Sequence, residues 1–437
     1  MRSVSLVEHI EFDFTGPVLR NGLTLGDVDN DGHQELVVGN EDGDVSIFKG
    51  TECWQTLSGL GFIACVVIGD ILNIKQNCLV IVSADGWCHI YSQKKHVTID
   101  ETNTSVPDSE TVDGQASSSV RTEAEVEEDV ILDDRGLLEC VHKQRIPPNT
   151  KVAILGDVDG DGVIELVLGL TDRVVRSYRW VDSQQSDSTN ENLQTNVTFK
   201  NIQGKLVGLN KWECANQIGS VTLHHAADGS PCLLVAQPGG TFMRIKCQPE
   251  GIFEQIIENF DASESNSVRS ESFAASFVDY QFLGLSRMRN QNISTEILGD
   301  LNTTNDSRKQ TLAASQPSTS KQSDNDTVKT KGKPYAVATL DGTIMLVQDE
   351  IILWAIQVDH QPFALEKLDV SGNGSDDIIV CSWDGQTYIL DQEKNSVAFH
   401  LDEPVKAFCC GYYTVTPEVK PVPSLVYVTF WNKVVIY

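Results

Sequence analysis

The sequence GDVDNDGHQELVVG at residues 26–39 returns as GDVDGDGVIELVLG at residues 156–169. Counted from Asp27 and from Asp157, acidic residues stand at positions 1, 3, 5 and 9 of each loop and a glycine stands at position 6. A short apolar run follows. Such alternating oxygen donors are typical of a calcium loop, but an EF-hand also needs a helical glutamate at position 12. Position 12 is Val38 or Leu168, inside an apolar run. The pattern therefore predicts an acidic turn that leads into a β-strand, and the EF-hand interpretation fails.

The same pattern recurs along most of the chain. Four clear copies lie at residues 26–48, 69–91, 156–178 and 368–390, and weaker copies lie at 219–246, at 299–301 continuing at 335–347, and at 407–437. The step from Gly26 to Gly69 is 43 residues, and the step from Leu368 to Ala407 is 39. Four short strands at a period near 40 residues are typical of a propeller blade. We therefore predict an all-β fold, with residues 1–437 forming a single seven-bladed β-propeller.

Polar segments interrupt these repeats. They are predicted to be loops, mostly disordered, because they offer little apolar surface to offset the entropy of ordering, and they lie at residues 93–145, 183–203, 250–296 and 301–333. The third of them also contains GIFEQIIENF and SFVDYQFLGL, so short structure stays open there. A strand near Val4 to Phe14 is predicted to complete the last blade and to close the ring.

Composition limits the classes of partner and the compartment. The chain has 33 basic and 62 acidic residues, a net charge of −29, which argues against nucleic acid and against direct binding to an anionic membrane. The 11 cysteines are odd in number and lie mostly in apolar runs, as free thiols in a reducing compartment do. No signal peptide and no apolar run of membrane-spanning length is recognised. We expect a cytoplasmic protein.

The two full acidic loops are the candidate metal sites. Their predicted ligands are carboxylates and one backbone carbonyl per loop, from Asp27, Asp29, Asp31, His33 and Glu35 and from Asp157, Asp159, Asp161, Val163 and Glu165. No cofactor is required, and Ca²⁺ or Mg²⁺ would have a structural role. A compatible alternative is that the Asp side chains cap backbone N–H groups of the turn. A third loop, from Asp369 to Asp377, has lost charge and is predicted to bind more weakly.

Enzymatic chemistry finds no support in the sequence. No nucleophile elbow, Walker loop, HExxH or CxxC motif is present. His224 and His225 are adjacent, so on a strand they would point to opposite faces and could not bind one metal from the same face. We interpret these histidines and His360 as structural.

Several motifs carry a resemblance to a known family. The acidic loop between strands resembles the FG-GAP repeat of integrin α-subunits, and the motifs TDRVVR (171–176), FALEKLD (363–369), WDGQTYI (383–389) and LVYVTF (425–430) resemble intracellular integrin-α FG-GAP repeat proteins that are subunits of the KICSTOR complex. The resemblance implies a scaffold, at the lysosomal surface, that recruits the GATOR subcomplex acting on Rag GTPases. It thereby restrains TOR complex one when amino acids or glucose are scarce.

The resemblance also implies the partners and the location. They are a kaptin-like propeller, a large scaffold subunit and the GATOR subcomplex, with peripheral attachment to lysosomal membranes through the complex. The resemblance also implies that relatives continue beyond the position of Tyr437 into a helical tail. The alternative is an integrin-like adhesion module or another cation-stabilised interaction propeller. Four tryptophans, Trp87, Trp180, Trp354 and Trp383, are either partner anchors or packing between blades.

Overall fold

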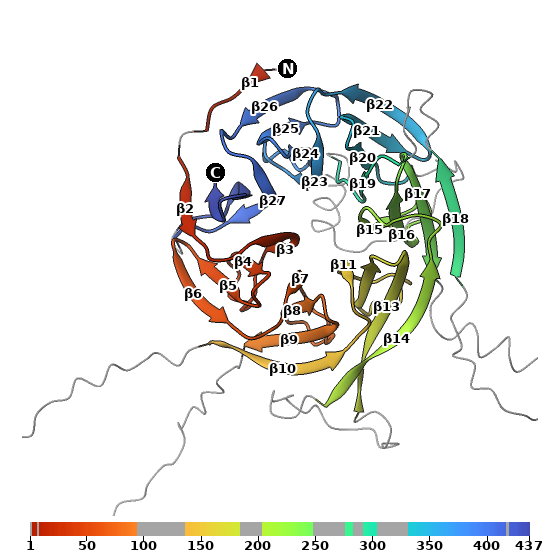
Figure 1. The fold of residues 1–437 in the computed structure, drawn as a ribbon. Coiled ribbons are helices and arrows are strands. Elements are labelled where there is room, and N and C mark those ends of the chain that lie inside the picture. The colour runs from red at the N-terminus through yellow and green to blue at the C-terminus, as the bar shows by residue number, and fades with distance from the viewer. Residues whose placement is uncertain are drawn as a thin grey trace, which may run out of the picture.

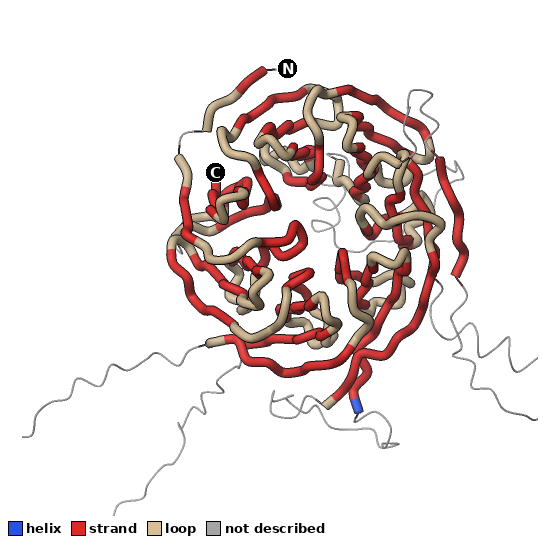
Figure 2. Tube along the Cα trace, in the orientation of Figure 1, coloured by secondary structure: helices blue, strands red, loops and turns tan. Residues whose placement is uncertain are grey.

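The computed structural model describes residues 2–6, 8–93, 136–183, 203–247, 276–282, 292–303, 331–416 and 419–437. Their strands form seven sheets set around a central axis, as Figure 1 shows. Strands joined by short loops make up nearly all of the ring (Figure 2). Within these residues, no helix has the length and apolar character needed to cross a membrane. The predicted seven-bladed β-propeller is confirmed.

Each blade runs from an inner strand at the axis to an outer strand at the rim (Figure 1). The first four blades are β3 (Val18–Gly26), β4 (Glu35–Asn40), β5 (Val45–Lys49) and β6 (Glu52–Leu57); β7 (Ile63–Gly69), β8 (Cys78–Ser83), β9 (Trp87–Gln93) and β10 (Leu138–Arg145); β11 (Thr150–Gly156), β12 (Glu165–Leu170), β13 (Val174–Asp182) and β14 (Gly204–Glu213); and β15 (Val221–His225), β16 (Pro231–Gln237), β17 (Thr241–Cys247) and β18 (Ser276–Phe282).

The last three blades follow the same plan. They contain β19 (Thr295–Leu298), β20 (Tyr335–Thr339), β21 (Thr343–Gln348) and β22 (Ile351–Gln357); β23 (Pro362–Leu368), β24 (Asp377–Ser382), β25 (Gln386–Leu390) and β26 (Ser396–His400); and β27 (Val405–Tyr413), β28 (Val422–Thr429) and β29 (Lys433–Ile436). Successive strands within a blade pair antiparallel.

The core lies between the blades rather than within them. The second strands β4 (ELVVGN) and β12 (ELVLGL) are buried at every residue, because neighbouring blades cover both of their faces. Among the described residues, buried apolar side chains group into seven clusters, and each cluster joins two successive blades. The cluster around Phe12, Phe48 and Tyr413 joins the last blade to the first. Closure of the ring is therefore part of the core.

The N-terminal segment closes the ring, as predicted. β2 (Ile10–Asp13) pairs antiparallel with β29 and supplies the fourth strand of the last blade. The predicted strand, Val4 to Phe14, is too long at its beginning. β1 (Arg2–Ser3) belongs instead to the sixth blade, where it pairs parallel with β26. The N-terminal segment thus fastens two blades, because its two short strands add to neighbouring sheets.

Two predicted insertions contain strands. Residues 138–145 of the 93–145 insertion form β10, and SFVDYQF of the 250–296 insertion forms β18. Both are outermost strands; β10 keeps a half-exposed face, so its polar composition resembles that of a loop. Residues 295–296, at the end of the same insertion, belong to β19. Most of the remaining residues of these two insertions, and most of 183–203 and 301–333, lie outside the described residues.

Candidate functional site

The first acidic loop joins β3 to β4 and is held by its own backbone. Asp27 caps the turn, because its carboxylate accepts the N–H groups of Asp31 at 3.1 Å and Gly32 at 3.0 Å. Gly32 has a φ of +88°, the left-handed conformation that glycine adopts without strain. Glu35 accepts the N–H of Val28 at 2.8 Å. The prediction that acidic side chains brace this turn is confirmed.

The second loop, between β11 and β12, repeats this arrangement. Asp157 accepts the N–H groups of Gly160 at 2.7 Å and Gly162 at 2.9 Å. Glu165 accepts the N–H of Val158 at 3.0 Å. Asp70 caps the N–H groups of Ile74 and Lys75 in the second blade, although Leu72 and Ile74 occupy the next donor positions there. The hydrogen bonds from backbone N–H groups to the Asp70 carboxylate therefore shape the turn of the second blade without the other acidic residues.

Carboxylates converge in both full loops. Oxygens of Asp27, Asp29 and Glu35 lie within 4.8 Å of one another, and so do oxygens of their counterparts Asp157, Asp159 and Glu165. Asp31 and Asp161 stand outside these groups, where their carboxylates accept the N–H of His33 at 2.8 Å and of Val163 at 2.9 Å. The ligand roles predicted for the carbonyls of His33 and Val163 stay predictions.

A basic side chain from the third strand of the blade enters each group. In the first blade, Nζ of Lys49 on β5 contacts Asp29 directly, lies 3.2 Å from Asp31 and lies 3.8 Å from Glu35. The Lys49 ammonium therefore stands among the same oxygens that would ligate a metal ion. Burial lowers the pKa of Lys49, but the three carboxylates outweigh burial and raise it, so the side chain stays charged.

Arg179 on β13 does the same in the third blade with better geometry. Its guanidinium lies 2.8 Å from Asp161 and 3.0 Å from Asp159, and it reaches Glu165 at 2.5 Å through Nη2 and 2.7 Å through Nε. Glu165 and Arg179 are directly opposite each other in the β12–β13 ladder. Arginine suits this place because its planar fork donates to several carboxylates at once.

Burial dominates the electrostatics of the innermost acid in each loop. It raises the pKa of Glu35 to about 8, against the Val28 N–H and Lys49, which lower it. Burial likewise raises the pKa of Glu165 to about 7, against the Val158 N–H and Arg179. Both residues are almost completely buried. Glu35 is therefore mostly protonated at neutral pH and Glu165 is about half protonated, and in each loop the basic partner opposes the full effect of burial on this pKa.

The two loops do not fit a metal ion in this arrangement. Their donors are the hard oxygens that Ca²⁺ prefers, but an ammonium or guanidinium group already neutralises them. A cation could bind only after Lys49 or Arg179 moved away. Metal binding by these residues stays a prediction, and it requires that movement. Lys49 and Arg179 were missed in the sequence, although each follows the last acid of its loop by fourteen positions (49 − 35 and 179 − 165).

The third loop, in the sixth blade, has the same hydrogen bonds from backbone N–H groups to its carboxylates, but no counterpart of Lys49 or Arg179 on its third strand. Asp369 accepts the N–H groups of Asn373 at 3.0 Å and Gly374 at 2.7 Å, and Asp377 accepts the N–H of Val370 at 3.1 Å. Asp391 stands fourteen positions after Asp377 (391 − 377), where the other two loops carry Lys49 and Arg179. Burial and the charges of Asp369 and Asp391 together raise the pKa of Asp377 to about 6, against the hydrogen bond from the Val370 N–H, which lowers it.

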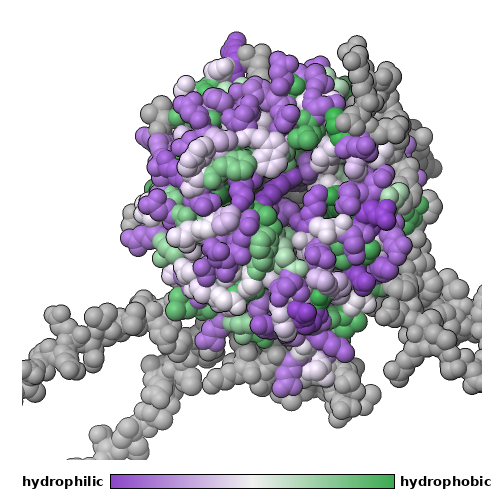
Figure 3. Space-filling view, in the orientation of Figure 1, coloured by the Kyte–Doolittle hydropathy of each residue, from purple (hydrophilic) through white to green (hydrophobic). Residues whose placement is uncertain are grey.

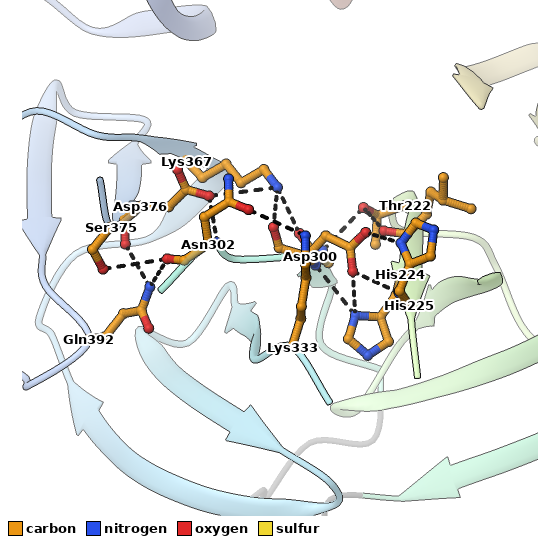
Figure 4. Close-up of polar contacts among 12 residues, drawn as sticks. Thr222, His224, His225, Asp300, Asn302, Lys333, Lys367, Ser375, Asp376 and Gln392 are labelled. Carbon is orange, nitrogen blue, oxygen red and sulfur yellow. Dashed lines mark hydrogen bonds and ion pairs between the residues drawn. The ribbon is translucent and has the colours of Figure 1, made fainter. Parts of the chain in front are cut away.

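The fifth repeat has a different network, shown in Figure 4. Asp300, the counterpart of Asp27, accepts the His225 N–H at 2.7 Å, and its carboxylate lies 3.2 Å from Nδ1 of His224 and 2.5 Å from Nδ1 of His225. Lys367 donates to the Asp300 carbonyl at 2.5 Å. Burial would raise the pKa of Asp300, but the hydrogen bonds from both histidines outweigh burial and lower it.

The two adjacent histidines share one partner. Both rings reach the Asp300 carboxylate from the neighbouring blade, whereas the expectation that they cannot bind one metal from the same face of a strand stays a prediction. The contacts of His224 and His225 with Asp300 join the fourth blade to the fifth. The hydrogen bond from Lys367 on β23 to the Asp300 carbonyl joins the sixth blade to the same residue. His360 pairs with Asp384. All three histidines therefore have structural partners.

Comparison with known proteins agrees with this architecture. The family model described as integrin-alpha FG-GAP repeat-containing protein 2 matches residues 49–437. A Mus musculus relative, named KICSTOR complex protein ITFG2, is 36% identical over 442 residues, which cover 100% of this chain and 85% of the relative. A Bos taurus relative of the same name is 33% identical over 440 residues, covering 100% and 71%.

A solved structure supports the fold. The crystal structure of BBS1N in complex with ARL6DN, soaked with lead, superposes with a TM-score of 0.53 at 12% identity, over 100% of this chain and 97% of that one. This likeness shows the propeller fold alone. The family model and the relatives cover almost the whole chain, so the chain belongs to the integrin-alpha FG-GAP repeat-containing protein 2 family.

Proposed function

We propose that this protein is a non-catalytic scaffold subunit of a KICSTOR-like complex. In this role it helps to recruit the GATOR subcomplex, which acts on Rag GTPases, to the lysosomal surface, and so restrains TOR complex one when amino acids or glucose are scarce. Its immediate partners are a kaptin-like propeller and a large scaffold subunit. It reaches the membrane through the complex and not by direct insertion.

Similarity along the whole chain carries the proposal. Relatives named as KICSTOR complex proteins align with 100% of this chain, so the likeness covers every blade and not one shared motif. A rigid ring with a continuous inter-blade core suits a subunit that presents several surfaces at fixed distances.

The arrangement of titratable groups supports a non-catalytic role. The convergent carboxylates of the two full loops are engaged by Lys49 and Arg179 and by backbone N–H groups. Buried thiols such as Cys65 and Cys381 have pKa values raised by burial, to about 12 for Cys381, so they are poor nucleophiles. All 11 cysteines are free, which suits a reducing compartment.

Reconstitution tests the proposal. The tagged chain is co-expressed with a kaptin-like subunit and the large scaffold subunit, and the mixture is analysed by size-exclusion chromatography with light scattering. We expect co-elution in one complex, and a chain that elutes alone under all conditions would refute the assignment. In cells lacking the protein, GATOR should leave lysosomes and TOR complex one should stay active during amino acid withdrawal. Re-expression of the intact chain is the control.

A further inference from the structure

Two neighbouring turns on one face of the ring carry exposed aromatic side chains. The turn between β24 and β25 presents Trp383, which is 38% exposed, and the turn between β28 and β29 presents Phe430 at 53% and Trp431 at 70%. In Figure 3 hydrophobic (green) and near-neutral (white) groups gather among hydrophilic ones on the visible face, in the sector where Figure 1 places β23 and β27. We call Trp383, Phe430 and Trp431 the aromatic patch.

The aromatic patch rests on a rigid base. The Trp383 ring stacks on buried Phe363 with centroids 4.1 Å apart, and its centroid lies 6.3 Å from that of Phe430. The Phe430 N–H donates to the Pro404 carbonyl at 3.1 Å, and the Val405 N–H donates to the Trp383 carbonyl at 2.9 Å. Side chains held in this way lose little conformational entropy on binding.

The fold itself does not require these aromatic residues. The equivalent turns of other blades contain Glu41-Asp42-Gly43, Ala84-Asp85-Gly86 and Leu340-Asp341-Gly342, with no aromatic residue among them. Those turns make the same backbone contacts with the linkers, as the hydrogen bonds from the Leu340 N–H to the Ser294 carbonyl and from the Asn149 N–H to the Ala84 carbonyl show. Aromatic side chains at the last turn therefore add exposed apolar surface without adding core.

Acidic residues border the aromatic patch. The linker from β26 to β27 runs beside both turns and carries Asp402, whose side chain is fully exposed, and Glu403. From there a groove of about 570 Å³ continues between the sixth and seventh blades. Its lining combines apolar groups with acids and includes Leu6, Leu401, Tyr437, Glu11, Asp402 and Glu403. Lys433 pairs with Glu11 and Glu403, which leaves the Asp402 charge without a lysine or arginine partner in the described residues.

We propose that the aromatic patch and the adjoining acidic groove dock a partner-protein segment that carries both aliphatic and basic residues. Exposed Trp and Phe rings on a rigid base are the residue types that anchor protein interfaces, and they also receive cations over their faces. The acidic border selects a positively charged segment and repels an anionic membrane. The inference rests on the proposed scaffold function, for which it assigns one contact surface.

Peptide binding tests the chemistry of this surface with the intact chain. Three fluorescent synthetic peptides of equal length are compared by anisotropy: alternating Leu-Arg, alternating Leu-Glu, and alternating Ser-Arg. We expect the Leu-Arg peptide to bind most tightly and Phe430→Ser with Trp431→Ser to raise its Kd by at least about tenfold. The matched control, Ile351→Ser with Leu353→Ser, removes exposed aliphatic groups from β22 and should leave the Kd unchanged. Equal binding of all three peptides, or none, would overturn the proposal.

Two further arms decide between partner classes. Asp402→Asn with Glu403→Gln should weaken Leu-Arg binding by several-fold and reduce its dependence on salt. Binding of the chain to phosphatidylserine vesicles that is lost with the Phe430/Trp431 pair would show a membrane surface instead, and so reject the protein partner.

Reconstitution separates this inference from the proposed function. If the parent chain assembles and the Phe430/Trp431 variant does not, while the Ile351/Leu353 variant does, both stand. If the parent chain fails to assemble, the proposed function fails, and peptide binding alone then judges the surface. Normal assembly of the Phe430/Trp431 variant, together with unchanged peptide binding, would reject the docking surface and leave the scaffold assignment intact.

Discussion

The acidic loops of the third and sixth blades have the same turn and opposite charge balance. In both, the last acid accepts a backbone N–H at the start of the loop, Glu165 from Val158 and Asp377 from Val370. Arg179 faces Glu165 across the hairpin, whereas Asp391 occupies the equivalent position after Asp377. The comparison teaches that the third strand, and not the acidic loop, decides whether the carboxylates are neutralised.

Removal of the cation from the third blade should have the largest effect. Arg179→Met leaves Asp159 and Glu165 buried without a basic partner, and breaking a buried pair from one side costs about 3–5 kcal/mol in the free energy of unfolding. Urea denaturation measures the loss. Lys211→Met, on β14 of the same blade, is the control because the Lys211 ammonium pairs with the exposed Glu213. Equal stability of both variants would show that Arg179 is not needed to balance the loop.

Neutral replacements of the last acid should act with opposite signs in the two blades. Glu165→Gln keeps an oxygen for the Val158 N–H but loses the charge that Arg179 contacts, so we expect a destabilisation of about 1–3 kcal/mol. Asp377→Asn removes a carboxylate repelled by Asp369 and Asp391, and should stabilise the protein by about 1 kcal/mol near neutral pH. Equilibrium unfolding of both variants measures these differences. Destabilisation in both would mean that the caps alone matter.

The pH dependence of the free energy of unfolding should also reflect the lack of a basic partner in the sixth blade. The pKa of folded Asp377 is raised to about 6, whereas the unfolded pKa is near 3.9, so the folded state binds the proton more tightly. This residue's contribution to stability therefore grows as pH falls from about 7 to about 4. Linkage predicts a change of roughly 2 kcal/mol over that range, so we expect the Asp377→Asn advantage of about 1 kcal/mol to vanish or reverse by pH 4. Unfolding curves of both proteins at several pH values measure it, and a constant difference would contradict the argument.

The loops and the ring could be predicted because their signals are local. Alternating acids, Gly32 and Gly162 lie within a few residues of one another, and the repeat period fixes the blade. Arg179 could not be placed from the loop alone, because its contact with Glu165 depends on the register of the β12–β13 hairpin. A cross-strand comparison of the repeats would have found it. The strand β10 was missed for a different reason, since an outer strand needs no continuous apolar run.

For the wild-type protein, we expect calcium to have no effect on stability through the acidic loops. The wild-type midpoint of urea unfolding should not respond to Ca²⁺ through the two full loops, because Lys49 and Arg179 stand among their oxygens. Arg179→Met frees the oxygens of Asp157, Asp159 and Glu165, which converge within 4.8 Å, so it should gain about 1.4 kcal/mol when Ca²⁺ is at tenfold its dissociation constant. Urea titrations with Ca²⁺ or with chelator measure this gain, and Lys211→Met is again the control. A wild-type protein stabilised by Ca²⁺ while Arg179→Met is not would mean that the guanidinium helps to form a metal site, and the comparison between the two blades would have to be reversed.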